Sequence, residues 1–245
     1  MEKLVEIRGV VKKYDKIILD NLNFAVRRRD LISIIGPNGC GKTTLMNIIA
    51  GLDQPNSGIV KKSNNLKIGF VFQNCKESLL PWRDIYTNIQ LPLEITSCKD
   101  DICQPRINAL LKAFDLTEHR HKFPHQLSGG LIQLTAIARA LASNPDLLIL
   151  DEPFKSLAFD TARRTMELVI AYCESKKMSA ILISHDIDQA ILFADKIIVL
   201  SHPPTSIRQV VNVDISRPRR LAHCRQCSFF ATKNRVLEEF ENEHN

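Results

Sequence analysis

The chain has 245 residues and a formal net charge of +6, and 44% of its residues are hydrophobic. This balance excludes a disordered or fibrous protein, and the length suits one large α/β domain with its own core. No run of roughly 18 apolar residues is present, and charges interrupt the first stretch, MEKLVEIRGVVKKYDK, so we expect neither a membrane span nor a signal peptide but a cytosolic location.

The first third of the chain predicts strands followed by one helix. Residues 4–26 mix alternating and apolar runs with turn residues, which predicts short strands. Leu31 to Gly36 is a continuous apolar run, typical of a buried parallel strand. Residues 43–52 then predict a helix with one apolar face, formed by Leu45, Ile48, Ile49 and Leu52.

The rest of the chain alternates helices with strands. We predict a strand at Leu66 to Gln73, an irregular helical region from about Glu77 to Leu127 and a helix at Leu131 to Ser143. The prolines that interrupt the helical region are Pro81, Pro92, Pro105 and Pro124, and its core-facing stripe is Ile107, Leu110, Leu111 and Phe114. The strands LLILD, AILIS and KIIVLS follow, with an amphipathic helix between the first two. Such alternation predicts a mainly parallel sheet, whose ligands bind beyond the carboxyl ends of the strands.

The net charge suggests nucleic acid or a membrane as a partner, and the cysteines suggest disulfides or zinc. Other features of the sequence argue against each of these. A basic chain favours nucleic acid or an anionic membrane, but its short basic runs lack interleaved aromatic residues and are better explained as solvated surface. Seven scattered cysteines argue against a disulfide framework. Cys224 and Cys227, beside His223, have the spacing of zinc ligands, but without a second such pair we favour free thiols.

A glycine-rich turn follows the first buried strand. It fits the pattern G-x-x-x-x-G-K-[ST], in which glycines let backbone N–H groups converge on a phosphate and the next helix adds the positive end of its dipole. Lys42 would reach the β- and γ-phosphates, the Thr43 hydroxyl would help to hold Mg²⁺, and Thr44 would support the loop. The predicted phosphate site comprises Gly36, Pro37, Asn38, Gly39, Cys40, Gly41, Lys42 and Thr43.

Three other strand ends carry polar side chains suited to the same Mg-nucleotide. Asp151 would orient Mg²⁺ through its water shell, and Glu152 would activate or position the attacking water. Gln73 would contact both metal and water, and His185, after AILIS, would bond the γ-phosphate. Taken singly, Gln73 is better explained as a surface amide, and a helix cap is the alternative for His185. The convergence of four strand ends favours a catalytic site.

A second glycine-bearing anion site begins the helix near Leu131. Ser128, Gly129 and Gly130, in LSGG, precede that helix without a lysine. Because one γ-phosphate does not need two such sites in one chain, we predict that each chain offers LSGG to the nucleotide held by its partner. This arrangement implies a sandwich dimer.

These motifs, in this order, resemble those of the ABC transporter ATPase family over nearly the whole chain. The matching motifs are GPNGCGKTT as Walker A, Gln73 as the Q-loop, LSGG as the signature, LLILDEP as Walker B and His185 as the H-loop. The resemblance implies an α/β P-loop NTPase fold with a RecA-like core, an N-terminal antiparallel β subdomain and an inserted helical subdomain at about residues 77–143. It implies one domain over residues 1–245, with a tail from about residue 202.

The same resemblance implies ATP and Mg²⁺ as cofactors, hydrolysis of ATP, and a role for Tyr14 in stacking on adenine. From the sequence alone, Tyr14 is explained equally well as a packing residue.

A finer resemblance is to ATPases of nitrate, sulfonate, taurine and pyrimidine-precursor importers, carried by SLLPWRDIYTNIQLPLE, DEPFKSL, ISHDIDQAI and the tail VLSHPPTSIRQVVNVDISRPR. It implies a peripheral subunit on the cytoplasmic face of the membrane, paired with an identical or related ATPase subunit. Its other implied partners are permease subunits and, through them, an external solute-binding protein, with no nucleic acid. In that group the segment containing Leu80, Pro81 and Trp82 lies near the docking site of the permease, although Trp82 could equally belong to the core.

The sequence departs from the family at three places. Ala158 replaces the family's usual aspartate after Walker B, Leu134 lies where a basic residue is usual, and Gln189 replaces a commoner glutamate. Because Asp151 and Glu152 remain, we expect hydrolysis to survive with weakened communication between the two sites. Three alternatives stay open: a soluble ABC ATPase acting on nucleic acid or ribosomes, a weakly hydrolysing, ATP-gated binding subunit, and the ATPase of an exporter, against which only the family-level resemblance argues.

Overall fold

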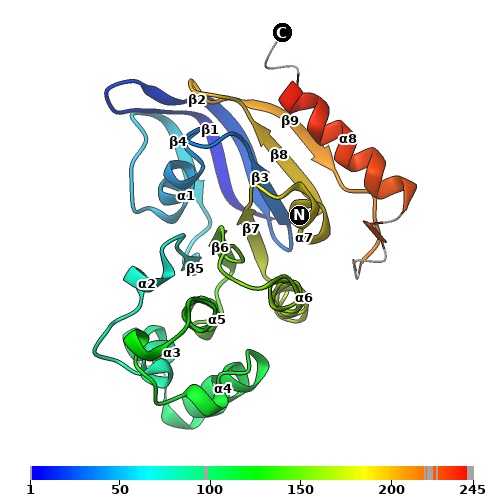
Figure 1. Cartoon of the computed structure of the whole chain (residues 1–245). Helices are drawn as coiled ribbons and strands as arrows, with labels where there is room; N and C mark the ends of the chain where they lie inside the picture. Colours follow the sequence, from blue (N-terminus) through cyan, green and yellow to red (C-terminus); the bar gives the residue numbers. More distant parts are fainter. Residues whose placement is uncertain (1, 97–98, 218, 220–222, 225, 242–245) are drawn as a thin grey trace. The chain divides into compact units, whose positions relative to one another are not determined.

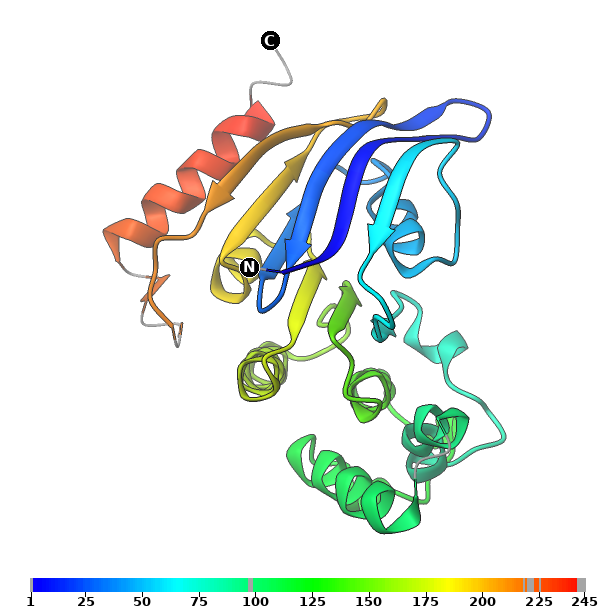
Figure 2. The same ribbon diagram turned by 180° about the vertical axis from the view of Figure 1, so that it is seen from behind.

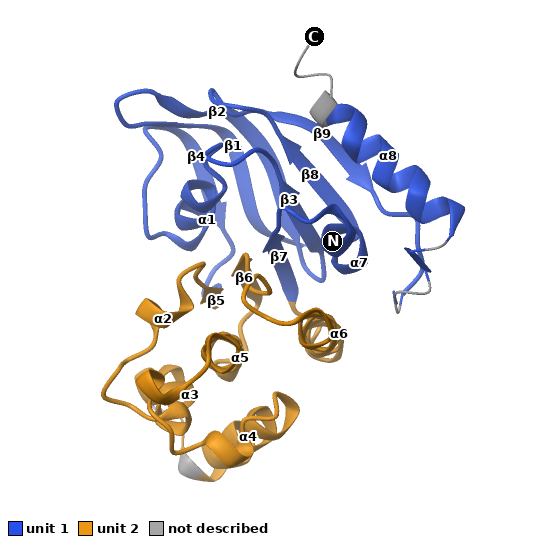
Figure 3. Ribbon diagram, viewed as in Figure 1, with its two compact units in different colours: residues 1–66, 179–245 blue, residues 67–178 orange. Residues whose placement is uncertain are grey.

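The chain folds into two compact units in this computed structural model, which describes residues 2–96, 99–217, 219, 223–224 and 226–241. Unit 1 comprises Met1–Leu66 and Ser179–Asn245, and unit 2 comprises Lys67–Met178 (Figure 3). Unit 1 thus joins the two ends of the chain, and unit 2 is inserted between them in sequence.

Unit 1 combines an antiparallel sheet with a mainly parallel group of strands (Figures 1 and 2). Its elements are β1 (Lys3–Lys13), β2 (Ile17–Arg27), β3 (Leu31–Ile35), α1 (Lys42–Ala50), β4 (Ser57–Lys62), β7 (Ser179–Ile183), α7 (Ile187–Phe193), β8 (Lys196–Leu200), β9 (Ile207–Asn212) and α8 (Cys227–Glu241). The antiparallel sheet has the order β2-β1-β4. β3 lies between its parallel neighbours β7 and β8, and β9 pairs antiparallel with β8.

The centre of unit 1 is β3, whose five residues are all buried. Ile34 of β3 pairs with Ile183 of β7 on one side and with Ile198 of β8 on the other. Such β-branched residues suit a strand that is covered on both faces. Because β3, β7 and β8 run in the same direction, the loops that follow them leave from one edge of these strands.

Unit 2 is largely helical. Its elements are β5 (Ile68–Val71), α2 (Cys75–Ser78), α3 (Ile85–Ile95), α4 (Asp100–Ala113), the 3₁₀ turns η1 (Thr117–His119) and η2 (Pro124–Gln126), α5 (Gly129–Ala142), β6 (Leu147–Asp151) and α6 (Phe159–Lys176). β5 and β6 are parallel, with Ile68 opposite Leu147. α5 packs against α2, α3 and α4 and is buried along most of its length. The predicted core stripe of α4 is buried, which confirms that interpretation.

Two element boundaries differ from the sequence expectation. α1 ends at Ala50, because Gly51 adopts a left-handed conformation with φ 87° and caps the helix. Leu52 therefore lies outside the helix and is 61% exposed instead of packing on its apolar face. β5 ends at Val71, so Gln73 lies in the loop after the strand rather than at its last position.

Pro81 and Pro124 lie between the α-helices of this region, as the sequence predicted, but two other prolines do not interrupt a helix. Pro92 lies inside α3 and Pro105 inside α4. A proline within a helix removes one backbone hydrogen bond and strains the preceding turn, but packing can offset this cost. Ile89 and Leu93 of α3 are buried on either side of Pro92, which supplies that packing.

The cysteines follow the free-thiol expectation with one exception. Cys40, Cys75, Cys224 and Cys227 have free thiols, whereas Cys103 is in a disulfide bond. A single bond does not make a disulfide framework, because an odd number of cysteines excludes complete pairing but not one bond.

Two features are absent from the described residues. They contain no helix with the length and apolar character needed to span a membrane. They also contain no cluster of three or more His, Cys, Asp or Glu side chains that could hold a metal ion.

Candidate functional site

The loop between β3 and α1 is a cradle built by its own backbone. Gly39 and Gly41 have φ angles of 77° and 90°, in the left-handed region that glycine adopts without strain. The Lys42 side chain is only 7% exposed, and its Nζ donates hydrogen bonds to the carbonyl oxygens of Gly36 and Pro37, each at 2.8 Å. The loop therefore holds a buried ammonium group against neutral acceptors at the N-terminus of a helix.

A residue that the sequence did not single out supports this cradle. The Thr205 hydroxyl, fully buried, donates to the Cys40 carbonyl oxygen at 2.6 Å. The backbone of Thr205 also contacts β2, because the Thr205 N–H donates a hydrogen bond to the Ile18 carbonyl oxygen at 2.8 Å. Thr205 thus connects the phosphate loop to the segment before β9. No local pattern marks it, because the two partners are 165 positions apart.

Tyr14 lies at the end of the β1–β2 hairpin and is 57% exposed, which excludes the packing interpretation. Its hydroxyl donates to Asp53 at 2.8 Å, and the Lys12 Nζ lies 4.9 Å from the ring centroid. The hydrogen bond to Asp53 and then burial raise the pKa of Tyr14, whereas Lys12 and a hydrogen bond with Thr44 act in the opposite direction. The ring is therefore held beside the phosphate loop with much of its surface accessible.

His185 lies in the short loop between β7 and α7, and it is exposed. The loop is held by its neighbours: Asp186 caps α7 by accepting from the backbone N–H groups of Asp188 and Gln189. The Ser184 hydroxyl accepts from Asp186 N–H at 3.0 Å and donates to Gln189 at 3.3 Å. Gln189, one of the departures from the family, thus helps to fix the loop that presents His185.

In unit 2, the Glu152 carboxylate, directly after β6, meets Gln73 of the loop after β5. Asp151 is buried at the end of β6. Glu152 follows with φ 48°, a left-handed conformation that is strained for a residue with a side chain and is frequent at functional sites. Its Oε2 accepts from Gln73 Nε2 at 3.4 Å and lies 3.1 Å from Lys155 Nζ. The structure therefore brings together Glu152 and Gln73, as the sequence predicted, and adds Lys155, which the sequence reasoning missed.

Gln133 fixes the backbone around these carboxylates. It is buried in α5, donates to the Glu152 carbonyl oxygen at 3.3 Å and accepts from Ser156 N–H at 3.2 Å. It thus bridges the turn between β6 and α6. At the N-terminus of the same helix, the Ser128 hydroxyl accepts from Leu131 N–H at 3.4 Å. Ser128 and Gly129 are exposed, so the N-terminus of α5 is open to a ligand.

The predicted site residues fall into two groups. Unit 1 contains residues 36–44, Tyr14 and His185, and unit 2 contains Gln73, the LSGG segment and the carboxylates after β6. Within each group the predicted side chains lie at the ends of the expected elements. The roles assigned to them in binding and catalysis stay predictions, as does the single-domain assignment.

Comparisons with known proteins identify the family. The family described as "ABC transporter" matches residues 19–155. The chain is 36% identical over 251 residues to an aliphatic sulfonates import ATP-binding protein of Bacillus thuringiensis subsp. konkukian, covering 97% of this chain and 96% of that one.

Solved structures agree with this match. An ATP-binding cassette in a dimeric, post-hydrolysis state bound to ADP and Pi has a TM-score of 0.78 at 31% identity, covering 86% of this chain and 100% of that one. CbiO1 of Clostridium perfringens, part of an ABC transporter complex, has a TM-score of 0.77 at 25% identity, covering 86% and 89%. These findings confirm the fold class predicted from the motifs. The chain belongs to the ABC transporter family and has the ABC ATPase fold.

Proposed function

We propose that this chain is the ATP-hydrolysing subunit of an ABC importer for an aliphatic sulfonate or a chemically related oxyanion. The phosphate loop carries the proposal, because the buried Lys42 ammonium donates hydrogen bonds to two carbonyl oxygens, which carry no formal charge. A buried cation is costly unless charge compensates it, and the γ-phosphate of ATP supplies that charge. Relatives named as import ATP-binding proteins support the transport function.

Unit 1 binds the nucleotide in this proposal. The backbone N–H groups of residues 38–43 and the Lys42 ammonium bind the phosphates at the positive end of α1. The exposed ring of Tyr14 stacks on the adenine base, and Asp53 keeps it in place through the phenol hydroxyl. His185, exposed at the end of β7, donates a hydrogen bond to the γ-phosphate.

Unit 2 supplies the groups that act on the attacking water. Glu152 positions the water or takes its proton, and the Gln73 amide holds the Glu152 carboxylate in place. The donors proposed for Mg²⁺ are the Thr43 hydroxyl, the Asp151 carboxylate and the Gln73 amide oxygen. All three are the hard oxygen donors that this cation prefers, so the residues fit. When bound, Mg²⁺ neutralises charge on the β- and γ-phosphates.

Two chains act together in this proposal. The exposed Ser128 and Gly129 at the N-terminus of α5 bind the γ-phosphate of the nucleotide held by a second copy or a close relative. A dimeric cassette with ADP and Pi among the similar structures supports this arrangement. ATP closes the dimer, and hydrolysis opens it again.

The segment around Trp82 is proposed to contact the permease. Trp82 is 71% exposed, which argues against the core alternative. The fully buried Asn88 side chain fixes the loop that carries Trp82. It accepts from Leu80 N–H at 2.9 Å. It also donates to the carbonyl oxygens of Leu80 and Arg83, at 3.1 and 2.8 Å. A large aromatic side chain on a fixed loop is well suited to be an interface anchor.

The ATPase part is tested by nucleotide binding and phosphate release with the purified chain. Lys42→Ala is expected to weaken ATP binding about 10- to 100-fold through the loss of a charge-assisted contact. Glu152→Gln is expected to keep ATP binding but to slow phosphate release by about 100-fold or more. Glu77→Gln, at an exposed position of α2, is the matched control. Equal rates for wild type and Glu152→Gln would support the weakly hydrolysing binding subunit instead.

The transport part is tested in liposomes that contain the copurified permease. We expect a binding protein loaded with ethanesulfonate, taurine or nitrate to accelerate ATP turnover for one of these solutes. Trp82→Ala is expected to abolish copurification, whereas Phe159→Ala, which is equally exposed at 71%, should preserve it. Salt-sensitive binding to nucleic acid, with no permease retained, would favour the soluble ABC ATPase.

A further inference from the structure

The position of His185 depends on α7, the short helix that follows its loop. Only Asp186 separates His185 from the helix, and Asp186 caps α7 by accepting from the N–H groups of Asp188 and Gln189 at 2.9 and 3.2 Å. Because α7 has only seven residues, its own backbone hydrogen bonds do not fix it, and it depends on contacts with other elements. A shift of its first turn therefore moves Asp186 and, with it, His185.

Burial fixes the second half of α7 better than the first. Residues 190–193 are buried, and the Ser33 hydroxyl of β3 donates to the Ala190 carbonyl oxygen at 3.3 Å. Residues 187–189, which form the turn next to His185, are only partly buried. The turn that matters most for His185 is thus the one with the weaker apolar packing, and polar contacts there carry more weight.

An arginine from the C-terminal segment binds the carboxyl end of α7. The buried Arg219 guanidinium donates to the carbonyl oxygen of Ala194, the C-cap residue of α7, at 2.6 Å. A cation is favourable there because the last carbonyl groups of a helix carry partial negative charge. The same guanidinium donates to the Ile215 carbonyl oxygen at 2.9 Å and to the Asp195 carboxylate at 3.2 Å. Arg219 thus joins the end of α7 to the segment that leads toward α8.

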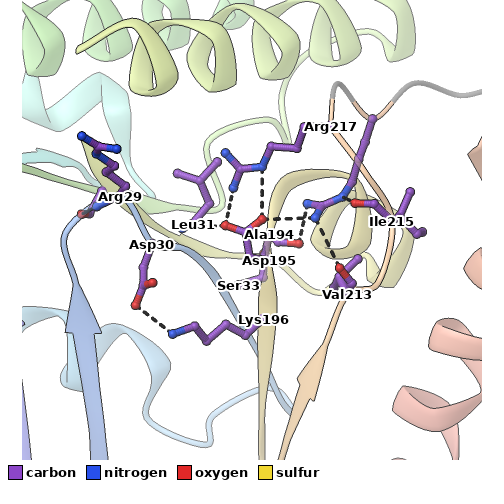
Figure 4. A network of polar contacts seen from close by, with 12 residues as sticks. Arg29, Asp30, Leu31, Ser33, Ala194, Asp195, Lys196, Val213, Ile215 and Arg217 are labelled. Carbon is purple, nitrogen blue, oxygen red and sulfur yellow. Dashed lines mark hydrogen bonds and ion pairs between the residues drawn. The ribbon is translucent and has the colours of Figure 1, made fainter. Parts of the chain in front are cut away.

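That segment is itself fixed to the start of β8. In Figure 4 the Arg217 guanidinium points toward Asp195, the residue before β8, and its Nε donates to Asp195 Oδ1 at 3.1 Å. The Val213 N–H donates to the Asp195 carbonyl oxygen at 2.9 Å. The C-terminal segment therefore contacts α7 from a fixed position.

A lysine of α8 contacts the amino end of α7. The Lys233 Nζ lies 2.7 Å from Oδ1 of Asp188, which is in the first turn of α7. α8 is anchored by Phe229 and Val236, which are both buried. It packs against α7 and β9, beside which it lies in Figures 1 and 2. The ammonium group is thus presented to the partly buried turn by an anchored helix.

We infer that Lys233 and Arg219 are positioning residues that hold α7 by its two ends and so keep His185 within reach of the γ-phosphate. Both act through α7, and neither contacts the nucleotide. The inference rests on the proposed function, because it takes the γ-phosphate as the partner of His185. It gives the C-terminal segment a role in ATP turnover in addition to its packing.

Phosphate release by the full chain tests the contact at the amino end. Lys233→Met removes the ammonium group and is expected to lower kcat by about two- to fivefold, a modest effect because the ion pair is partly exposed. Affinity for ADP, which lacks the γ-phosphate, should stay unchanged. Lys233→Arg keeps the charge and should retain the wild-type rate. Arg235→Met, which removes a charge at an exposed position of α8, is the matched control and should also match wild type.

Two outcomes of this comparison would overturn the role of Lys233. The first is an equal loss of kcat in Arg235→Met, which would mean that the total charge of α8 matters and the contact with Asp188 does not. The second is a matching loss of affinity for ADP in Lys233→Met, which would mean that the substitution damages unit 1 as a whole.

A double-mutant cycle tests whether Lys233 acts through His185. His185→Ala is expected to slow phosphate release by about tenfold or more through the loss of a hydrogen bond to a charged group. In that background Lys233→Met should cause no further slowing, because no side chain is left to position. A full additional loss would overturn the positioning role. A rate for His185→Ala equal to wild type would overturn the proposed role of His185 together with this inference, whereas a slow His185→Ala beside an unchanged Lys233→Met would overturn the role of Lys233 alone.

Arg219→Met tests the carboxyl end of α7. We expect a larger loss of kcat, about five- to twentyfold, because the guanidinium is buried and its acceptors lose their donor. Arg219→Lys, which keeps the charge but not the planar group of donors, should recover part of the rate. Urea denaturation shows whether each variant is folded, and Arg219→Lys decides the test if Arg219→Met is not. A folded variant with the wild-type rate would overturn the role of Arg219.

Discussion

The phosphate loop and the turn after β6 are stabilised in different ways. The phosphate loop is held by neutral, buried partners: Lys42 bonds carbonyl oxygens, and Thr205 bonds the Cys40 carbonyl oxygen. The turn after β6 instead has a strained residue, Glu152, whose carboxylate meets the partly exposed cation of Lys155. The first region has one conformation imposed by backbone geometry, whereas the second depends on charged side chains that solvent and ligands can compete for.

Because of this difference, we expect the phosphate loop to control nucleotide binding and the turn after β6 to control the rate of hydrolysis. A loop fixed by backbone geometry tolerates few substitutions, and its failure should abolish nucleotide binding. A carboxylate held by ion pairs can be adjusted by single side chains, so changes there should alter the rate while ATP still binds. Substitutions in the two regions should therefore differ in size and in the step they affect.

The largest effect, a loss of ATP binding, is expected from Gly41→Val. Gly41 has φ 90°, and a Cβ there would lie 2.7 Å from Ile18 Cγ2 and 2.9 Å from Leu19 Cδ2. The loop must shift to relieve both the strain and the overlap, which moves the N–H groups away from the phosphates. We expect ATP binding to fall by about 100-fold or more, which corresponds to losses of about 3 kcal/mol.

Gly39→Ala is the matched control for that substitution. Gly39 has a similar φ of 77°, but a Cβ there would have no neighbour within 4 Å. Only backbone strain of about 1 kcal/mol is expected, with ATP binding reduced by less than about tenfold. Isothermal titration of both variants with ATP measures the difference. Equal losses at the two positions would mean that the close approach to Ile18 is unimportant.

The sequence predicted the first region well because its requirements are local. Glycines at fixed spacing, a lysine and a following helix are consecutive, so Gly36 to Thr43 could be assigned from the pattern alone. Thr205 and Asp53, which support the loop and Tyr14, were missed because their partners are distant in sequence. Long-range hydrogen bonds of this kind leave no periodic or spacing signal.

The second region was predicted less completely. The carboxylates were assigned because they end a buried strand, but the pairing of Lys155 with Glu152 depends on the turn geometry and on the left-handed conformation of Glu152. The prediction that Pro92 interrupts a helix was wrong for a related reason, since Pro92 lies inside α3, where tertiary packing outweighed a local preference.

A smaller effect, on turnover alone, is expected from Lys155→Met. The substitution keeps the length of the side chain but removes the cation 3.1 Å from the Glu152 carboxylate. The carboxylate is then free to turn toward the attacking water, so we expect phosphate release to rise by about two- to fivefold at unchanged ATP affinity. Since Lys155 is 58% exposed, the pair is screened by salt and the effect stays modest.

Lys155→Arg, which keeps the charge, is the control for that variant and should behave like wild type. The difference between Lys155→Met and wild type should shrink as the salt concentration rises. Slower phosphate release from Lys155→Met would instead make Lys155 a residue that positions Glu152 for catalysis.

The smallest effect, a gain in the free energy of unfolding, is expected from Ala158→Asp at the N-cap of α6. Ala158 has the extended conformation of a cap residue, with φ −60° and ψ 149°, but makes no side-chain hydrogen bond to the helix. Aspartate there should accept from the backbone N–H groups of the first turn and raise the free energy of unfolding by about 1 kcal/mol.

Ala171→Asp makes the same chemical change at an exposed position inside α6 and should be neutral or destabilising. Urea denaturation of both variants measures this difference. Because the family's usual residue at position 158 is an aspartate that couples the two sites, Ala158→Asp should also steepen the dependence of hydrolysis on ATP concentration. A gain in stability with unchanged steepness would limit the role of this position to capping the helix, and the weakened communication expected from the sequence would then need another cause.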